Sequence, residues 1–180
     1  TILSDRIVNN GDAVSLSSEF SPLLEPEIMF IANEDLPYDA DLQTIILNTE
    51  IAAGIEIPEA RYKDWFPNFT LGDLICDDTA TGLIVVGNKV DPLDIDAFAH
   101  VQLNLYKDEE LIATGDSSEV LGNPLNAVLW LIKKLHSHGK QIKKGQVISS
   151  GTFISPLKLE YGTYRAEYSG IGTVEFKVSK

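Results

Sequence analysis

Three glutamates in two separate segments are the residues of this sequence that could bind a divalent cation. Glu25 and Glu27 lie two positions apart in "SPLLEPEIMF", and Glu56 lies between two isoleucines in "GIEIPEARYKDW". In a β-strand, residues i and i+2 project from the same face, so Glu25 and Glu27 are expected roughly 7 Å apart at Cα. Carboxylates this close raise each other's pKa unless a cation lies between them, and hard divalent cations prefer oxygen ligands. The spacing therefore indicates a metal site, with an ordinary solvated strand face as the alternative.

Pro26, which separates the two glutamates, restricts where they can lie in a sheet. Proline has no backbone N–H to donate to a neighbouring strand, so it is confined to an edge, a bulge or the start of a strand. We therefore expect this segment at such a position, where the backbone can aim both carboxylates at one point.

The 180-residue chain is strongly acidic, with a formal net charge of −13 at pH 7 and a pI near 4.5. This charge disfavours binding to nucleic acid or to an anionic membrane surface, because both are themselves negative. Apolar runs such as "GLIVVG" are far too short to span a bilayer. The single cysteine, Cys76, forms no disulfide within the chain, so we expect a cytoplasmic protein in which Cys76 is a small buried residue.

Short strands separated by frequent turns dominate the pattern of the sequence. Apolar and polar residues alternate on both sides of Lys107, Asp108 and Glu109, which predicts a β-hairpin. Four further strands are predicted in "GLIVVG", "GQVISSGTFI", "YRAEYSG" and "GTVEFKV". Strands and helices do not alternate regularly, so a curled or closed sheet is favoured over a parallel α/β fold.

Two segments have the apolar spacing of helices. One runs roughly from Asp39 to Asn48. The other follows Asn123, which can cap it, has Pro124 at its first position and ends at Gly139. The chain is therefore predicted to be α+β and rich in strands.

Several motifs occur in the order of one enzyme family: "LLEPEIMFIANEDLP", "GIEIPEARYKDW", "LGNPLNAVLWLIKKL", "GQVISSGTF" and "GIGTVEF". In these motifs the chain resembles the 2-keto-4-pentenoate hydratase and 4-oxalocrotonate decarboxylase family, within the fumarylacetoacetate hydrolase superfamily. The resemblance covers almost the whole chain, and its most specific part is the helix motif "LGNPLNAVLWL".

The resemblance implies curled, mixed β-sheets around a pocket, with a long helix outside, formed by residues 1–180 as one catalytic domain. It implies Mg²⁺ or Mn²⁺ held by Glu25, Glu27 and Glu56. Hydratases of this group also use a lysine and an acid from an N-terminal segment for proton transfer. This sequence begins too late to include that segment, so the full protein is expected to be longer, or else to be a shortened relative.

The activity that the resemblance implies is that of a metal-dependent lyase in the meta-cleavage breakdown of aromatic rings. Such an enzyme hydrates 2-hydroxypenta-2,4-dienoate to 4-hydroxy-2-oxopentanoate. Three alternatives stay open: a decarboxylase of the 4-oxalocrotonate type, a hydrolase of C–C bonds in acylpyruvates, and a metal-binding subunit without catalysis. The expected partners are a small 2-oxo or 2-hydroxydienoate acid, further copies of the same chain and an enzyme of the same pathway.

The segment "CDDTATG" departs from the family, which usually reads Asp-Asn-Ala-Ser here. Asp77 keeps the first acid and is implied to be catalytic, whereas Asp78 replaces the amide and Ala80 stands at the Ser position. Loss of a hydroxyl donor weakens a polar contact to substrate and could change which acid is accepted.

Three further residues are candidates for substrate binding. Gly151 and Thr152 follow a predicted strand and match a substrate-contacting turn of the superfamily, with a simple β-turn as the alternative. Arg61 could pair with an anionic substrate, and an ion pair elsewhere in the protein is the alternative.

Overall fold

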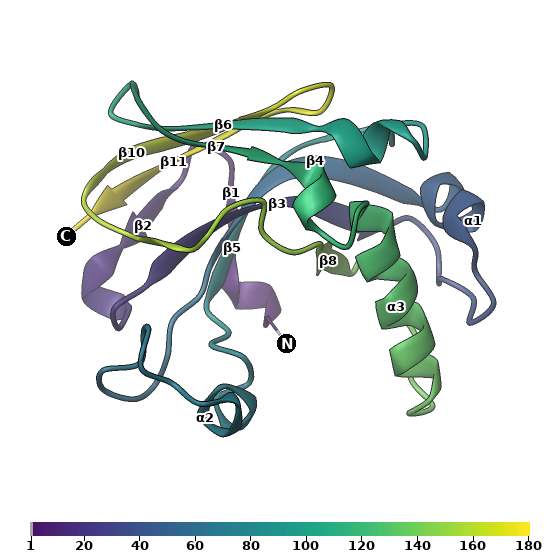
Figure 1. Cartoon of the computed structure of the whole chain (residues 1–180), viewed down its shortest axis with the longest axis horizontal. Coiled ribbons are helices and arrows are strands. Elements are labelled where there is room, and N and C mark those ends of the chain that lie inside the picture. The colour runs from purple at the N-terminus through teal and green to yellow at the C-terminus, as the bar shows by residue number, and fades with distance from the viewer. Residues whose placement is uncertain (1) are drawn as a thin grey trace.

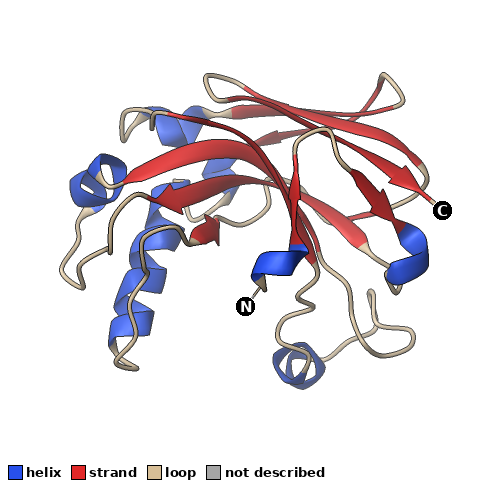
Figure 2. Cartoon of the chain, turned by 180° about the vertical axis from the view of Figure 1, so that it is seen from behind, coloured by secondary structure: helices blue, strands red, loops and turns tan. Residues whose placement is uncertain are grey.

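Two β-sheets packed over a common core form the body of the molecule in the computed structural model, which describes residues 2–180 (Figures 1 and 2). Thr1, the first residue of the predicted domain, lies outside the described residues. In order, the first sheet contains β1 (Ile7–Asn9), β5 (Leu83–Val90), β4 (Thr49–Ile57), β3 (Leu23–Ala32) and β8 (Val147–Ser149), and β9 (Leu157–Lys158) also pairs with β3. The second contains β2 (Ala13–Ser15), β11 (Gly172–Ser179), β10 (Gly162–Tyr168), β6 (Gln102–Lys107) and β7 (Glu110–Asp116).

Both sheets mix parallel and antiparallel pairs, as predicted, and the helices lie outside the strands (Figure 2). The α-helices are α1 (Leu42–Leu47), α2 (Leu71–Cys76) and α3 (Pro124–His136). Short 3₁₀ turns occur at Ser4–Arg6, Leu16–Ser18, Ala97–His100 and Ser117–Glu119. No helix within residues 2–180 has the length and apolar character needed to cross a membrane.

The predicted long helix is confirmed as α3. The Asn123 side chain accepts a hydrogen bond from the backbone N–H of Leu125, and Pro124 occupies the first turn, where a missing N–H costs nothing. Leu125, Val128 and Ile132 recur at helical spacing and are buried. Lysines in the last turn lie at the negative end of the helix dipole, where their positive charge stabilises the helix. The helix therefore follows from the capping signal and one apolar face.

Strand β3 is apolar on both faces because it is buried on both. Leu24, Ile28 and Phe30 face the core between the two sheets, and each is fully buried. Met29 and Ile31 face the opposite side and belong to a second, smaller apolar cluster. Burial of a large apolar side chain is worth about 1.5–3 kcal/mol. The strand is therefore held firmly in register, and this matters for its two glutamates.

The predicted hairpin is confirmed as β6 and β7, and the predicted helix near Asp39–Asn48 is confirmed as the shorter α1. Two predictions about other segments are wrong. The strand expected in "GQVISSGTFI" reaches only Ser149, because the chain then turns at Gly151 with φ +112°. Cys76 is exposed, not buried, because it ends a short helix on the surface.

Helix α2 was not predicted from the sequence. It has only six residues, too few for an apolar period, but it carries a capping box. Thr70 accepts from the backbone N–H of Asp73 at 3.2 Å, and the Asp73 carboxylate accepts from the backbone N–H of Thr70 at 2.8 Å. This reciprocal pair was the signal that could have revealed the helix.

Candidate metal centre

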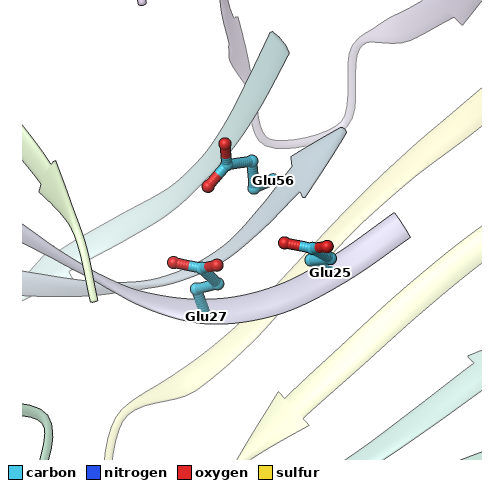
Figure 3. A group of neighbouring side chains, drawn as sticks. All are labelled: Glu25, Glu27 and Glu56. Carbon is cyan, nitrogen blue, oxygen red and sulfur yellow. The ribbon is translucent and has the colours of Figure 1, made fainter. Parts of the chain in front are cut away.

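The antiparallel pairing of β3 with β4 brings the three predicted glutamates together. Glu25 stands opposite Glu56 in the ladder, and Glu27 stands opposite Gly54. Because side chains alternate along a strand, all three carboxylates project from the face that points away from the core between the sheets. One carboxylate oxygen from each residue lies within 4.8 Å of the others, and the three groups converge on a common space (Figure 3).

Glu27 is the most deeply buried member of this carboxylate cluster, with 2% of its surface exposed. Its Oε2 atom accepts a hydrogen bond from the backbone N–H of Gly151 at 2.6 Å and a second from the Ser149 hydroxyl. A buried carboxylate needs such donors, since a buried polar atom without a partner costs free energy. Both donors act on Oε2, so neither uses Oε1.

Two glycines make room for this arrangement. Gly151 has φ +112°, a left-handed conformation that strains other residues, and this conformation aims its N–H at Glu27. Gly54 lies opposite Glu27, and a Cβ there would come within 2.3 Å of the Met29 side chain. Gly151 therefore provides a hydrogen bond to Glu27, and Gly54 leaves the space that the Met29 side chain fills.

The electrostatics of the cluster are dominated by the burial of three neighbouring acids. Burial, followed by repulsion from Glu56, raises the pKa of Glu25 to about 7. Burial is also the main cause that raises the pKa of Glu27, well above its ordinary value, with Glu56 adding to it. Burial raises the pKa of Glu56 as well, against a smaller opposing effect of the Ser149 hydrogen bond. The cluster therefore favours protons, or another cation, at neutral pH.

The donor set fits a hard divalent cation. Within residues 2–180, no lysine or arginine forms an ion pair with Glu25, Glu27 or Glu56. Three converging carboxylates supply the anionic oxygen atoms that Mg²⁺, Mn²⁺ and Ca²⁺ prefer, and they contain no soft sulfur or imidazole ligand. A single doubly charged ion would remove the repulsion among all three.

Pro26 lies in the fourth position of β3, between two segments that pair with the strand's outer side. Leu23 and Leu24 pair with β9, whereas Met29, Phe30 and Ile31 pair with β8. The Pro26 carbonyl accepts from the backbone N–H of Phe153 at 3.3 Å in the interval between them. The expected edge, bulge or strand-start position is therefore wrong, because Pro26 lies inside a strand that has partners on both sides. Its missing N–H is tolerated because it faces the interval between β9 and β8.

Asp77 and Arg61 form an ion pair with each other, outside the carboxylate cluster. Arg61 Nε lies 2.9 Å from Asp77 Oδ1, and the Arg61 guanidinium also donates to the backbone carbonyls of Asp77 and Thr81. The Asp77 side chain is only 9% exposed, and its Oδ2 atom is buried without a hydrogen-bond partner. The ion pair expected as the alternative for Arg61 is present, and its contact with substrate stays a prediction.

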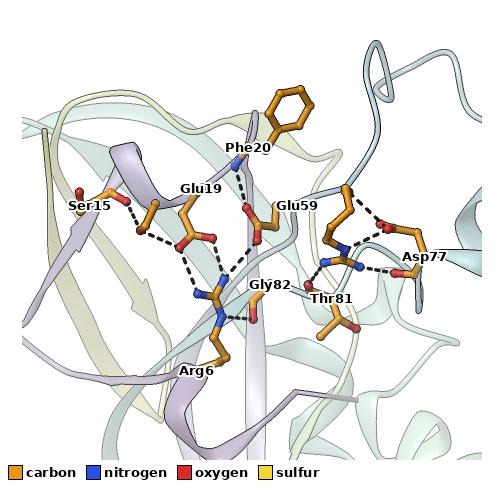
Figure 4. A network of polar contacts seen from close by, with 10 residues as sticks. Arg6, Ser15, Glu19, Phe20, Glu59, Asp77, Thr81 and Gly82 are labelled. Atoms are coloured by element: carbon orange, nitrogen blue, oxygen red, sulfur yellow. Dashed lines mark hydrogen bonds and ion pairs between the residues drawn. The ribbon is translucent and has the colours of Figure 1, made fainter.

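A second ion-pair network anchors the chain that leads from β4 toward this pair (Figure 4). Arg6 Nη2 lies 2.7 Å from Glu19 Oε2 and 3.2 Å from Glu59 Oε1. Glu59 Oε2 also accepts from the backbone N–H of Phe20 at 2.7 Å. Because Glu19 is 1% exposed and Glu59 12%, Arg6 neutralises two largely buried carboxylates. This network ties the loop after β4 to the N-terminal part of the chain.

Gly151 and Thr152 have different surroundings. The Gly151 backbone contacts Glu27 directly, as described above. The Thr152 hydroxyl donates to the backbone carbonyl of Ile154 at 3.1 Å and lines a cavity of about 740 Å³ beside β7. None of the three glutamates lines that cavity. The structure therefore brings Gly151, but not the Thr152 side chain, to the carboxylate cluster.

Ser149 is the residue of this centre that sequence reasoning missed. It lies on β8 opposite Met29, which places its side chain on the same face as Glu27. Its hydroxyl group donates to Glu27. Its position two residues before Gly151 was a weak signal, because the pairing of β8 with β3 cannot be read from local spacing.

The fold is that of solved proteins described as a 4-oxalocrotonate decarboxylase and a putative fumarylacetoacetate isomerase/hydrolase. A 4-oxalocrotonate decarboxylase from Pseudomonas putida G7, solved with magnesium and adipate, superimposes with a TM-score of 0.86. It shares 22% identity, and the match covers 97% of this chain and 67% of that one. No family model matches the chain.

Relatives of similar sequence identify the family of the chain. A 2-keto-4-pentenoate hydratase of Paraburkholderia phymatum is 31% identical over 183 residues, which cover 99% of this chain and 69% of that relative. The enzyme of the same name from Burkholderia vietnamiensis is 32% identical, over 96% of this chain and 66% of the relative. The chain belongs to the 2-keto-4-pentenoate hydratase family. It spans about two thirds of the length of these relatives.

Proposed function

We propose that this protein is a metal-dependent hydratase that converts 2-hydroxypenta-2,4-dienoate to 4-hydroxy-2-oxopentanoate in aromatic catabolism. One observation carries the proposal: Glu25, Glu27 and Glu56 place carboxylate oxygens within 4.8 Å of one another on adjacent strands. Family membership supports the hydratase activity over the other reactions of the superfamily. The large apolar core shared by both sheets supports one catalytic domain.

The three glutamates are proposed to hold Mg²⁺ or Mn²⁺. A bound ion supplies a Lewis acid that stabilises negative charge on the 2-oxygen of a substrate of this class. The role of the chain is to hold the ligands in place before the ion binds. Glu25 and Glu56 are fixed by their strand register, and Glu27 is fixed by Ser149 and Gly151.

Asp77 is proposed as the catalytic residue that moves a proton. Its unpartnered Oδ2 can accept or return a proton, while Oδ1 is held by Arg61. Hydration of a 2-hydroxydienoate needs such transfers, because the dienol must become the 2-oxo tautomer before water adds across the remaining double bond. Arg61 holds Asp77 in place and adds positive potential for an anionic acid. Gly151 and Thr152 are proposed to form the turn that the substrate contacts.

The remaining proposals concern the setting of the enzyme. An exposed free thiol at Cys76 supports a reducing, cytoplasmic location, because exposed thiols oxidise readily elsewhere. The small 2-hydroxydienoate acid is the proposed partner of the site. Assembly into a homo-oligomer, and association with another enzyme of the pathway, follow from the family resemblance alone.

One assay tests the function directly. The protein is freed of metal with EDTA, supplied with Mg²⁺ and 2-hydroxypenta-2,4-dienoate, and monitored for loss of the dienol absorbance. We expect loss of absorbance with Mg²⁺ and little without it. Release of CO₂ from 4-oxalocrotonate in the matched assay would move the assignment to the decarboxylase, and cleavage of acetopyruvate would move it to the hydrolase. Mg²⁺ binding without turnover of any of the three acids would favour a metal-binding subunit.

A further inference from the structure

We propose that Ser149 is a positioning residue that restricts Glu27 to binding the metal through Oε1 alone, and that this restriction favours Mg²⁺ over Ca²⁺. The inference deepens the proposed function and rests on it, because it concerns how the same centre chooses its ion. Ser149 acts through its hydrogen bond to Glu27.

The hydrogen bonds of Glu27 carry this inference. The Ser149 hydroxyl and the Gly151 N–H both donate to Oε2, so this oxygen already has two partners. Apart from a contact between the carboxyl groups of Glu27 and Glu56, no further hydrogen bond to the Glu27 side chain is found among the described residues, so Oε1 is the atom left for a cation. Metal ligands are commonly oriented in this way by a hydrogen-bonded second partner.

Three strands fix this geometry independently of any ion. Glu27 lies on β3, Ser149 lies on β8 opposite Met29, and Glu56 lies on β4 on the other side of β3. The carboxylate plane of Glu27 is therefore set by the order of strands in the sheet.

Single-oxygen binding discriminates between ions because their coordination differs. Mg²⁺ requires near-octahedral geometry with six ligands, whereas Ca²⁺ takes six to eight ligands and accepts both oxygens of one carboxylate. A Glu27 with Oε2 occupied cannot offer both oxygens to Ca²⁺ without losing two hydrogen bonds. Removing the hydroxyl of Ser149 frees part of Oε2 and relaxes this discrimination.

Ser150 offers a matched control on the same segment. It is also buried, at 4% exposure, but its hydroxyl accepts from the backbone N–H of Ile28 at 3.2 Å and donates to the backbone carbonyl of Gly151 at 3.3 Å. Ser150→Ala therefore removes a buried serine hydroxyl but leaves both hydrogen bonds to Glu27 Oε2 in place. Ser149→Thr keeps a hydroxyl at the critical position and serves as the rescue variant.

The experiment is calorimetric titration of the metal-free full chain with MgCl₂ and, separately, with CaCl₂. We expect Ser149→Ala to lower Mg²⁺ affinity by about 10- to 100-fold and to lower Ca²⁺ affinity less, so that the Mg²⁺/Ca²⁺ affinity ratio falls. Ser150→Ala and Ser149→Thr should keep the ratio of the wild-type protein. In the wild-type protein, the carboxylate stretching bands of the Mg²⁺ form should show a single-oxygen ligand, which tests the inference even if Ser149→Ala does not fold.

The titrations distinguish failure of the proposed role of Ser149 from failure of the proposed function. A wild-type protein that binds neither ion overturns the proposed function and this inference together. A wild-type protein that binds Mg²⁺, while Ser149→Ala keeps an unchanged ratio, overturns the role of Ser149 and leaves the proposed function standing. An equal fall in Mg²⁺ and Ca²⁺ affinity would assign Ser149 a merely structural role and would also overturn the inference.

Discussion

Glu25 of β3 and Glu56 of β4 are direct partners across an antiparallel ladder, on the same face of the sheet. Like charges at directly opposed positions destabilise a sheet, so ordinary strand pairing avoids this combination. Here the pair sits beside a third, buried carboxylate. The metal-free fold therefore carries a local cost that a bound divalent cation would remove, and this relationship makes the centre accessible to stability measurements.

Removing one charge of the cross-strand pair should stabilise the metal-free protein. We expect Glu56→Gln to raise the free energy of unfolding in EDTA by about 0.2–1 kcal/mol, because it relieves the repulsion from Glu25. The same variant should lose the rise in Tm that Mg²⁺ gives to the wild-type protein. Urea denaturation and thermal melts measure the two effects. Glu110→Gln, on an exposed position of β7, is the control and should change neither quantity. A destabilised Glu56→Gln protein in EDTA would contradict the proposed repulsion between Glu25 and Glu56.

The metal-free protein should lose stability as the pH rises toward neutrality. The folded-state pKa of Glu25 is raised to about 7 from an ordinary value of 4.5, so the folded state holds a proton that the unfolded state has released. This contribution is fully present below about pH 4.5 and is lost as the pH rises through about 7. We expect a lower free energy of unfolding at pH 8 than at pH 5.5 in EDTA.

The matched variant for this pH dependence is Glu25→Gln, which cannot titrate and should show a shallower slope over the same range. Saturating Mg²⁺ should reverse the trend in the wild-type protein, since metal binding to carboxylates strengthens as protons leave. Unfolding free energies that increase from pH 5.5 to pH 8 in EDTA would rule out the raised pKa.

Gly151→Ala should damage both the backbone and the metal centre. The left-handed φ of +112° is costly for alanine, and the new Cβ would lie 3.3 Å from Val120 Cγ1, so we expect a loss of stability of about 1–3 kcal/mol. The shifted N–H would also weaken its hydrogen bond to Glu27 and lower Mg²⁺ affinity. Gly139→Ala is the control: it also has positive φ, but it has open space around it and lies far along the chain from the carboxylates. It should lose stability without any change in Mg²⁺ affinity by calorimetry.

Asp77→Asn should separate catalysis from metal binding. If Asp77 moves a proton, turnover of 2-hydroxypenta-2,4-dienoate should fall by about 10²- to 10⁴-fold. Mg²⁺ affinity should not change, because Asp77 is not part of the carboxylate cluster. Asp64→Asn removes an exposed charge from the loop between β4 and α2 and should retain activity. Full turnover by Asp77→Asn would remove Asp77 from the mechanism.

The centre could be predicted where its geometry depends on strand alternation alone. The two-residue spacing of Glu25 and Glu27 places them on one face of any strand, and the apolar neighbours of Glu56 mark a second strand. Ser149 could not be predicted, because its contact with Glu27 depends on which strands become neighbours in the sheet. The Arg61–Asp77 pair joins residues 16 positions apart through a loop and a six-residue helix, which local patterns do not specify.

The exposure of Cys76 also could not be predicted from the residue type. Cysteine is usually buried, so composition favoured an inward-facing residue. The capping box between Thr70 and Asp73 instead starts a surface helix whose last residue is Cys76. Local hydrogen bonding decided the exposure of this side chain, and the general preference of the residue type did not.

The placement of all three glutamates on one ladder makes the ion a reporter of correct strand alignment. A slip of β4 by one position would turn Glu56 toward the apolar core and would put Ile55 or Ile57 in its place. A misaligned chain therefore loses one of three ligands at once, and its capacity to capture magnesium falls with it. Ion uptake during refolding should then appear only when β3 and β4 have reached their native pairing.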